Sequence, residues 1–190
     1  PRSDEHDELL FITIHQTYEL WFKQIMHELR GAMSALERDE ISRAAHRLSR
    51  VRHILKIAVA QVDILETLTP LEFAAFRSRL ATSSGFESAQ FRELEALLGV
   101  RNPRLADLLP DQAAREKVHV TMRSPSLWDT TLRWLSTRGY EIPDAVLNRD
   151  VSQPYEESGA VQETLLAIYR EGGEEANLLE QLVDIDEGVQ

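Results

Sequence analysis

The residues best suited to chemistry lie near the start of the chain, in the segment LFITIHQTYELWF at residues 10–22. Four of them would share one face of a helix because they recur at steps of four, three and four: Phe11, His15, Tyr18 and Phe22. This spacing places an imidazole inside an aromatic stripe. Such an imidazole can hydrogen-bond the N–H group of a heteroaromatic ligand.

A second pair, Phe73 and Arg77, is four residues apart and therefore also shares a helical face. The planar fork of an arginine matches a carboxylate. Together with His15, this pair describes a pocket for an aromatic amino acid. The residues alone leave a simpler interpretation open, in which His15 is a satisfied core histidine and Arg77 stabilises the carboxyl end of its own helix.

Other catalytic motifs are lacking from the sequence. A di-iron bundle needs a Glu-x-x-His pair on each of two helices, and the chain has one such pair, Glu116 and His119. There is no His-Glu-x-x-His, no glycine-rich phosphate loop and no Gly-x-Ser-x-Gly turn. We therefore expect no ion-binding metal site and no hydrolase or nucleotide chemistry. Three further histidines are expected to be solvated: His27, His46 and His53.

Composition favours an ordinary globular protein. The 190 residues are 43% hydrophobic and 28% charged, which fits one domain over residues 1–190. The net charge of −11, without long runs of like charge, disfavours nucleic acid and anionic membranes as partners. The chain has no cysteine and no apolar run long enough to span a membrane. We expect a cytoplasmic protein.

The elements that must position these residues are helices. Apolar spacing predicts helices over 7–37, 40–68, 69–80, 87–98 and 124–138, and over a terminal stretch interrupted at 172–173, with a short one possible at 111–122. Thr69, Pro70 and Glu72 form a capping box for the third helix. No alternating strand pattern of useful length occurs. The predicted fold class is an all-α helical bundle.

The second predicted helix has a marked apolar face, expected to be buried along its whole length. The residues on that face are Leu48, Val51, Leu55, Val59, Val62 and Leu65. Gly99 is expected to end the helix before it in the C′ position.

Two long segments resemble the tryptophan 2,3-dioxygenases, haem enzymes that open the indole ring of L-tryptophan. They are HDELLFITIHQTYELWFKQIMHELR and ILETLTPLEFAAFRSRLATSSGFESAQFRELEALLG, with the interval of the family between them. Weaker similarity continues through SLWDTTLRWL to LVDID. The resemblance implies the all-α bundle of the tryptophan and indoleamine 2,3-dioxygenases.

The resemblance also assigns roles to residues. It makes His15 the catalytic distal histidine that hydrogen-bonds the indole N–H, and Arg77 the clamp for the substrate carboxylate. Phe11 would stack near the indole, and Phe73 would supply an aromatic contact without a hydroxyl. The remaining assigned residues are Ile12, Thr13 and Ile14 in the pocket-lining segment, and Ser84 and Gly85 at the haem edge.

The activity implied by the resemblance inserts both atoms of O2 across the indole C2–C3 bond and yields N-formylkynurenine, the first step of tryptophan catabolism by the kynurenine pathway. The implied cofactor is haem b, and the implied partners are L-tryptophan, O2 and further copies of the chain in a homotetramer. His15 is expected to steer the indole rather than to remove its proton, because indole N–H is a very weak acid.

The sequence departs from the family pattern at both ends. The proximal haem histidine of the family would lie beyond Gln190, and the family's N-terminal arm and carboxyl-terminal segment are also missing. We expect a fragment of a complete enzyme, and whether this form holds haem is left open. Two other functions stay open: a related haem-dependent aromatic oxygenase that acts on a substituted indole, and a non-catalytic helical assembly module.

Overall fold

A computed structural model describes residues 1, 3–78, 80 and 88–189. Over these residues the chain forms helices, turns and loops without a strand, which confirms the all-α prediction. The helices are α1 Glu8–Glu37, α2 Ile41–Leu65, α3 Pro70–Arg77, α4 Ala89–Leu98, α5 Pro103–Asp107, α6 Gln112–Met122, α7 Leu127–Thr137, α8 Asp144–Leu147, α9 Gly159–Glu171 and α10 Glu174–Val189.

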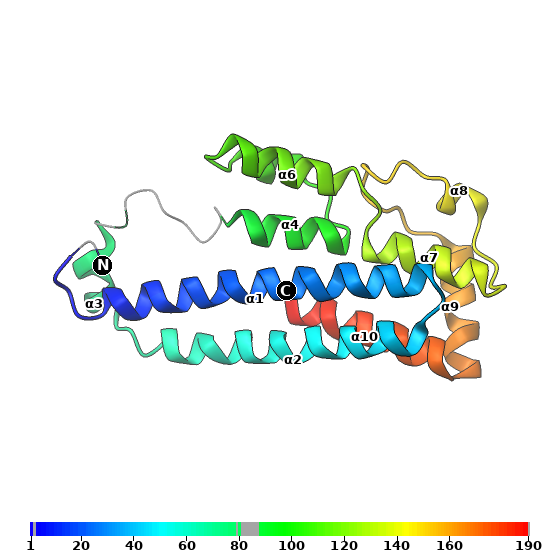
Figure 1. The fold of residues 1–190 in the computed structure, drawn as a ribbon, viewed down its shortest axis with the longest axis horizontal. Helices are drawn as coiled ribbons and strands as arrows, with labels where there is room; N and C mark the ends of the chain where they lie inside the picture. The colour runs from blue at the N-terminus through cyan, green and yellow to red at the C-terminus, as the bar shows by residue number, and fades with distance from the viewer. Residues whose placement is uncertain (2, 79, 81–87, 190) are drawn as a thin grey trace.

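The long helices α1 and α2 run antiparallel, side by side, along the longest axis of the molecule (Figure 1). Helix α4 packs on α1 and carries α6 on its outer side, while α10 lies along α2. Helices α7 and α9 gather at the end where α1 turns into α2. The short helix α3 lies at the opposite end, near the first turns of α1. The two candidate segments of the sequence therefore meet at one end of the bundle.

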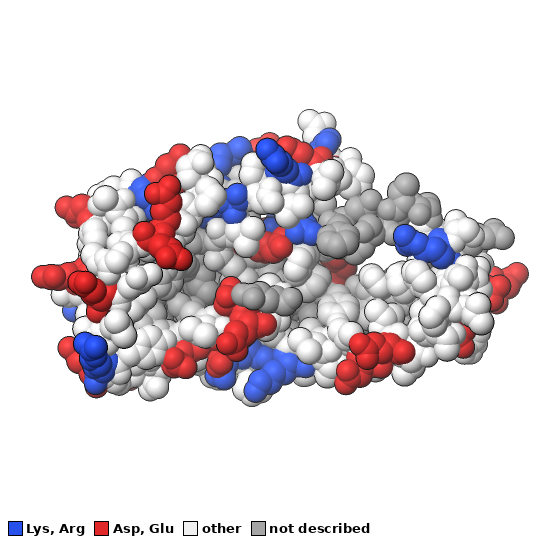
Figure 2. All heavy atoms as spheres, turned by 180° about the vertical axis from the view of Figure 1, so that it is seen from behind, with Lys and Arg blue, Asp and Glu red and all other residues white. Residues whose placement is uncertain are grey.

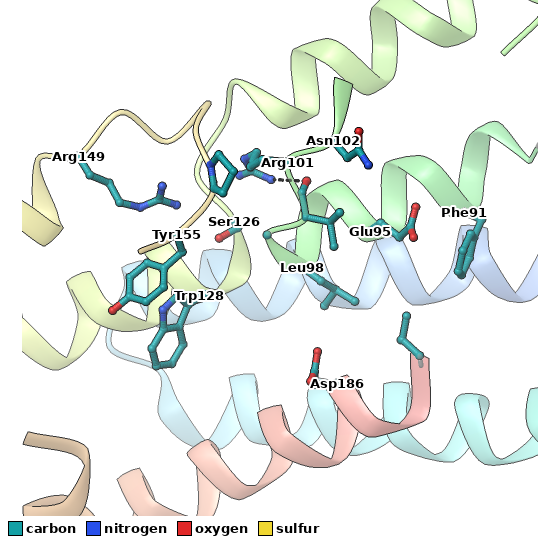
Figure 3. Close-up of a pocket in the computed structure, with 14 residues that line it drawn as sticks. Phe91, Glu95, Leu98, Arg101, Asn102, Ser126, Trp128, Arg149, Tyr155 and Asp186 are labelled. Atoms are coloured by element: carbon teal, nitrogen blue, oxygen red, sulfur yellow. Dashed lines mark hydrogen bonds between the residues drawn. The ribbon is translucent and has the colours of Figure 1, made fainter. Parts of the chain in front are cut away.

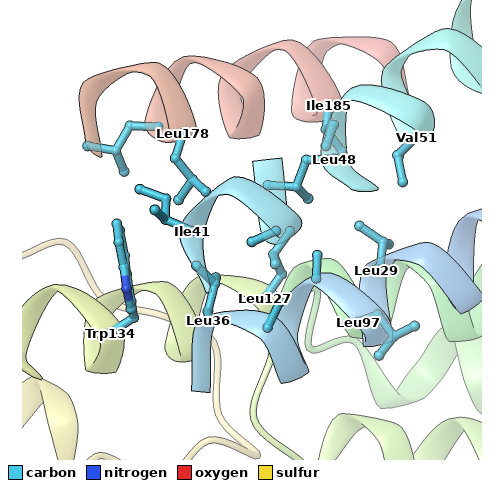
Figure 4. Close-up of a cluster of buried hydrophobic side chains, with 14 of the residues drawn as sticks. Leu29, Leu36, Ile41, Leu48, Val51, Leu97, Leu127, Trp134, Leu178 and Ile185 are labelled. Atoms are coloured by element: carbon cyan, nitrogen blue, oxygen red, sulfur yellow. The ribbon is translucent and has the colours of Figure 1, made fainter. Parts of the chain in front are cut away.

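The main core lies between α1, α2, α4, α7 and α10. Figure 4 shows its buried side chains, among them Leu29, Leu36, Ile41, Leu48, Val51, Leu97, Leu127, Trp134, Leu178 and Ile185. Burial of such side chains contributes about 1.5–3 kcal/mol each to folding. The indole Nε1 of Trp134 donates a 2.8 Å hydrogen bond to the Asp39 carboxylate in the α1–α2 turn. This bond helps to hold Asp39 at a φ of 56°.

Most predicted helix boundaries are confirmed to within a few residues, and three differ for local reasons. Helix α2 ends at Leu65 and α3 ends at Arg77, both three residues before the predicted ends. Helix α7 begins after Ser126 rather than at residue 124, because Ser126 and Asp129 form the capping box. Helices α5 and α8 are short and lie in stretches for which the sequence predicts no helix.

The predicted burial of α2 holds for its first half and is wrong for its second. Leu48, Val51 and Leu55 are buried, but Val59 and Val62 are 58% and 41% exposed and Leu65 is only half-buried. Gly188, near the end of α10, lies against Leu55, so the described part of α10 covers α2 only to this point. Periodicity shows which residues share a face but not whether a neighbouring element covers that face.

The surface of the described residues mixes both signs of charge. Figure 2 shows lysine and arginine side chains interspersed with acidic ones over one face, rather than gathered in a continuous basic patch. Among the described helices, none combines the length and the apolar character that crossing a membrane requires. The exclusion of nucleic acid as a partner stays a prediction.

Candidate active site

His15 lies half-buried in the second turn of α1, with one ring nitrogen occupied by its own helix. Its Nδ1 lies 2.8 Å from the carbonyl oxygen of Phe11. A carbonyl oxygen only accepts hydrogen bonds, so Nδ1 carries the hydrogen and Nε2 of the neutral ring is an acceptor. Within the described part of the chain, no hydrogen bond engages Nε2. The local geometry of α1 therefore presents an acceptor that suits an N–H donor.

The Phe11 ring contacts this imidazole and packs with two further phenylalanine rings in the aromatic cluster, defined as Phe11, Phe73 and Phe76. The centroid of the Phe11 ring lies 4.0 Å from that of His15 and 5.7 Å from those of Phe73 and Phe76. Phe73 and Phe76 meet edge to face at 5.5 Å. Such pairs add about 0.5–1.5 kcal/mol beyond the area they bury. The cluster thus joins α3 to the start of α1.

Phe76 was not among the predicted site residues, although it is completely buried and touches Phe11. Its spacing could have revealed it. Residues 73, 76 and 77 fall at i, i+3 and i+4 and must share a helical face.

Arg77 is the last residue of α3 and is exposed. Its guanidinium carbon Cζ lies 5.6 Å from the centroid of the Phe73 ring, a cation–π contact. No hydrogen bond or ion pair holds the guanidinium among the residues that the structure describes. As far as the described residues go, the fork is therefore open to an anion beside the aromatic cluster, as a carboxylate clamp requires.

The start of α3 is set by its predicted capping box, which the structure confirms. The Thr69 hydroxyl accepts a hydrogen bond from the Glu72 N–H at 3.3 Å, and the Glu72 carboxylate accepts one from the Thr69 N–H at 2.7 Å. The hydrogen bond from the Thr69 backbone is the main cause that holds the pKa of Glu72 below its ordinary value, and the Thr69 side chain adds to it. The cap starts the helix that carries Phe73 and Arg77.

The other predicted residues lie in different surroundings. Ile14 is buried in the core, Ile12 is half-buried, and Thr13 is exposed. The helical turn thus points these three neighbours in different directions. Ser84 and Gly85 lie outside the described residues.

A separate cavity of about 690 Å³ lies between the end of α4, the loop at 149–155 and α10 (Figure 3). Arg101 is buried beside it and donates to the backbone carbonyls of Val151, Ala96 and Ser124 at 2.7, 2.6 and 3.0 Å. The sequence patterns do not reveal this cavity, because its residues come from segments with no common periodicity.

Asp129 joins Arg101 to Arg149, and the three residues form the arginine–aspartate cluster. The Nε of Arg149 donates to Asp129 at 2.9 Å, and Arg101 lies 3.9 Å from the same carboxylate. Burial works against ionisation of Asp129, but hydrogen bonds from Ser126 and Arg149 outweigh it and hold the pKa of Asp129 below its ordinary value. The polar groups of this cluster have partners within the chain, which indicates a structural role.

The described residues hold no group of three or more His, Cys, Asp or Glu side chains that could bind a metal ion. Glu116 and His119 are instead paired with Arg123 and Asp107. The half-buried rings of Phe11 and Phe73 give the aromatic cluster an apolar wall, a surface on which a flat aromatic group can pack. The residues assigned to the haem edge are not described, so the fit to haem rests on this wall and on His15.

Comparison with known proteins gives matches that cover both helices of this site, α1 and α3. The family model of tryptophan 2,3-dioxygenase matches residues 1–118. A tryptophan 2,3-dioxygenase of Anaeromyxobacter dehalogenans is 53% identical over 193 residues, covering 100% of this chain and 72% of that protein. The chain belongs to the tryptophan 2,3-dioxygenase family.

Other members of the tryptophan 2,3-dioxygenase family agree over the same span. The protein of Herpetosiphon aurantiacus is 47% identical, with 100% of this chain and 74% of that protein covered. The protein of Bacillus thuringiensis is 40% identical, with 99% and 69% covered. The two segments that carry the resemblance in the sequence, 6–30 and 64–99, both lie within the family match. The predicted family is confirmed.

Proposed function

We propose that the full-length gene product oxidises L-tryptophan with O2 to N-formylkynurenine, the first step of the kynurenine pathway. The single observation that carries this proposal is the Nε2 of His15, which no hydrogen bond engages within the described residues. It lies beside the Phe11 ring, at the same end of the bundle as the exposed fork of Arg77. An acceptor for an indole N–H and a donor for a carboxylate are thereby presented at either side of an apolar wall.

Each residue has a role in holding the substrate. Arg77 binds the carboxylate through its fork, and His15 accepts the indole N–H through Nε2. The half-buried rings of Phe11 and Phe73 pack against the indole and keep water away from the reacting bond. Orientation by both ends of the substrate accelerates the reaction because it removes rotational freedom before the chemical step. His15 need not take the proton, because its role is to direct the ring.

The cofactor proposed for this site is haem b. When bound, haem supplies O2 binding and redox chemistry. Phe11 and Phe73 would pack against it, and Ser84 and Gly85 are proposed to border its edge on the strength of the family resemblance. Iron without a porphyrin has no cluster of ligands in the described residues.

The test of this proposal compares two histidines of the full-length protein. His53 makes the same bond on α2 that His15 makes on α1: its Nδ1 lies 2.7 Å from the carbonyl of Ser49, four residues earlier. We expect His15→Ala to lower kcat/KM for L-tryptophan by about tenfold, the loss of one hydrogen bond that orients the substrate. His53→Ala should leave kcat/KM unchanged.

Three outcomes would count against the proposal. Equal effects of the two histidine variants would remove His15 from the site. If the wild-type protein shows a haem spectrum but its product contains only one oxygen atom from ¹⁸O2, the related aromatic oxygenase would be indicated. If the full-length protein binds no haem, the non-catalytic helical assembly module is the function that would remain.

We also infer self-association through the end of the bundle that carries the site. Large apolar side chains are exposed there on α1, α2 and α3: Leu9, Ile57, Val59, Val62, Ile64 and Leu71. A second copy of this chain would bury them, as in the homotetramer expected from the family. Light scattering of the full-length protein should give the mass of a tetramer. The cytoplasmic location and the single domain stay predictions.

A further inference from the structure

Tyr18 connects the helix of His15 to its neighbour α2. The phenol O–H of Tyr18 donates a 2.7 Å hydrogen bond to the backbone carbonyl of Ala58. Ala58 is buried in the middle of α2. Because Tyr18 follows His15 by three residues, both side chains lie on the same face of α1. This bond therefore acts on the part of α1 that presents the imidazole.

The Tyr18 bond resists rotation of α1 about its own axis. A tyrosine has a rigid ring with its hydroxyl at the tip, so a small rotation of the helix displaces the oxygen from its partner. A helical carbonyl has a second lone pair, so Ala58 can accept the phenol without losing its bond within α2. Burial raises the pKa of Tyr18, so the hydroxyl stays protonated and able to donate.

A second polar contact holds α1 one residue further along, from the side of α4. The side-chain amide of Gln90 donates to the backbone carbonyl of Glu19 at 3.1 Å and to its carboxylate at 2.7 Å. The rings of Phe22 and Phe91 pack below it with centroids 5.2 Å apart. Residues 18 and 19 are thus bonded to two different helices, one turn after His15.

We propose that Tyr18 is a positioning residue, whose bond to Ala58 sets the rotation of α1 so that Nε2 of His15 faces the substrate. This inference rests on the proposed function, because it assumes that Nε2 receives the indole N–H. Tyr18 itself is not placed in contact with substrate: its hydroxyl is used by Ala58, and its ring packs on Phe22 at 5.9 Å.

The test measures binding rather than turnover, with the full-length haem protein held without O2. Dissociation constants are determined by calorimetry for L-tryptophan and for 3-(3-benzothienyl)-L-alanine, in which sulfur replaces the indole N–H. The dissociation constant of the analogue divided by that of L-tryptophan reports the bond to Nε2, because only L-tryptophan carries the indole N–H. We expect Tyr18→Phe to reduce this ratio roughly threefold to tenfold, because one hydrogen bond is worth about that factor in binding.

Tyr169→Phe is the matched control. Tyr169 lies on α9, where the carboxylate of Glu180 on α10 interacts with its hydroxyl, so the variant loses one phenol interaction away from His15. Its ratio should equal that of the wild type.

An unchanged ratio in Tyr18→Phe, or equal weakening of both ligands, would overturn the positioning role, since general loosening affects both ligands alike. Thermal melting of each variant identifies such loosening. A wild-type protein that binds both ligands equally would instead overturn the proposed function, and this inference with it.

Discussion

The two ends of the bundle treat their polar groups in opposite ways. In the arginine–aspartate cluster, Arg101 and Arg149 donate to backbone carbonyls and to Asp129. At the aromatic end, within the described residues, Nε2 of His15 and the guanidinium of Arg77 have no hydrogen-bond partner. Polar groups that are satisfied inside the chain stabilise the fold, whereas groups left open beside an apolar wall can bind a ligand.

The two ends also differ in what joins their segments. Hydrogen bonds from buried side chains to backbone carbonyls hold the cluster around Asp129, which makes it rigid and specific. Ring contacts hold α3 to α1 at the aromatic end, and the capping box of α3 is exposed. Substitutions at the first end should therefore change stability, and substitutions at the second should change binding.

The largest expected effect on stability is that of Asp129→Ala. It leaves two arginines near the cavity without their shared carboxylate, and breaking such a buried pair costs about 3–5 kcal/mol. Chemical denaturation at pH 7 measures the loss. Glu116→Ala removes an ion pair that is exposed on both sides and should cost less than about 1 kcal/mol. Similar losses in both variants would contradict the structural role of the cluster.

The dependence of the unfolding free energy on pH in the acid range tests the same residue, Asp129. The pKa of Asp129 is lower in the folded state than the ordinary value near 4, so its ionised form stabilises the fold above that value. This contribution is lost as the pH falls through the folded-state pKa. The difference in unfolding free energy between wild type and Asp129→Asn should therefore shrink below about pH 4. A difference that stays constant with pH would show that ionisation of Asp129 is irrelevant.

A smaller free-energy change, confined to binding, is expected for Arg77→Met. The variant keeps an unbranched apolar stem but loses the fork, and a charge-assisted bond is worth about 1.5–3 kcal/mol. L-Tryptophan should therefore bind roughly tenfold to a hundredfold more weakly, as measured by calorimetry. Tryptamine, which lacks the carboxylate, is the control ligand and should bind the two proteins alike. Equal weakening of both ligands would place Arg77 in the fold rather than at the carboxylate.

The smallest effect is expected for Thr69→Ala, which removes the cap of α3. Loss of a threonine cap costs about 1 kcal/mol. Hydrogen exchange of the amides of α3 should report a loss of protection of that size, with little change elsewhere. Thr121→Ala is the control, because its hydroxyl bonds to a carbonyl within the exposed part of α6. Loss of protection throughout the bundle would show that the aromatic end is coupled to the core more tightly than its contacts indicate.

Local patterns predicted most of the helices and the cap of α3, because spacing, N-caps and glycines act within a few residues of one another. Gly99, for example, ends α4 in the left-handed conformation, as expected. The same patterns do not predict which neighbouring element covers a helical face. Val59 and Val62 continue the apolar face of α2 beyond the point reached by the described part of α10.

The sequence by itself determined the all-α class, the family and the pairing of His15 with Phe11 one turn away, since all of these depend on residue types and short intervals. Only the tertiary structure decided that α3 packs its rings on the start of α1, that Phe76 is the buried member of that cluster, and that Arg101 meets Asp129. The reason is physical. A helix dictates which of its own residues share a face, but contacts between distant segments depend on how all the helices pack together.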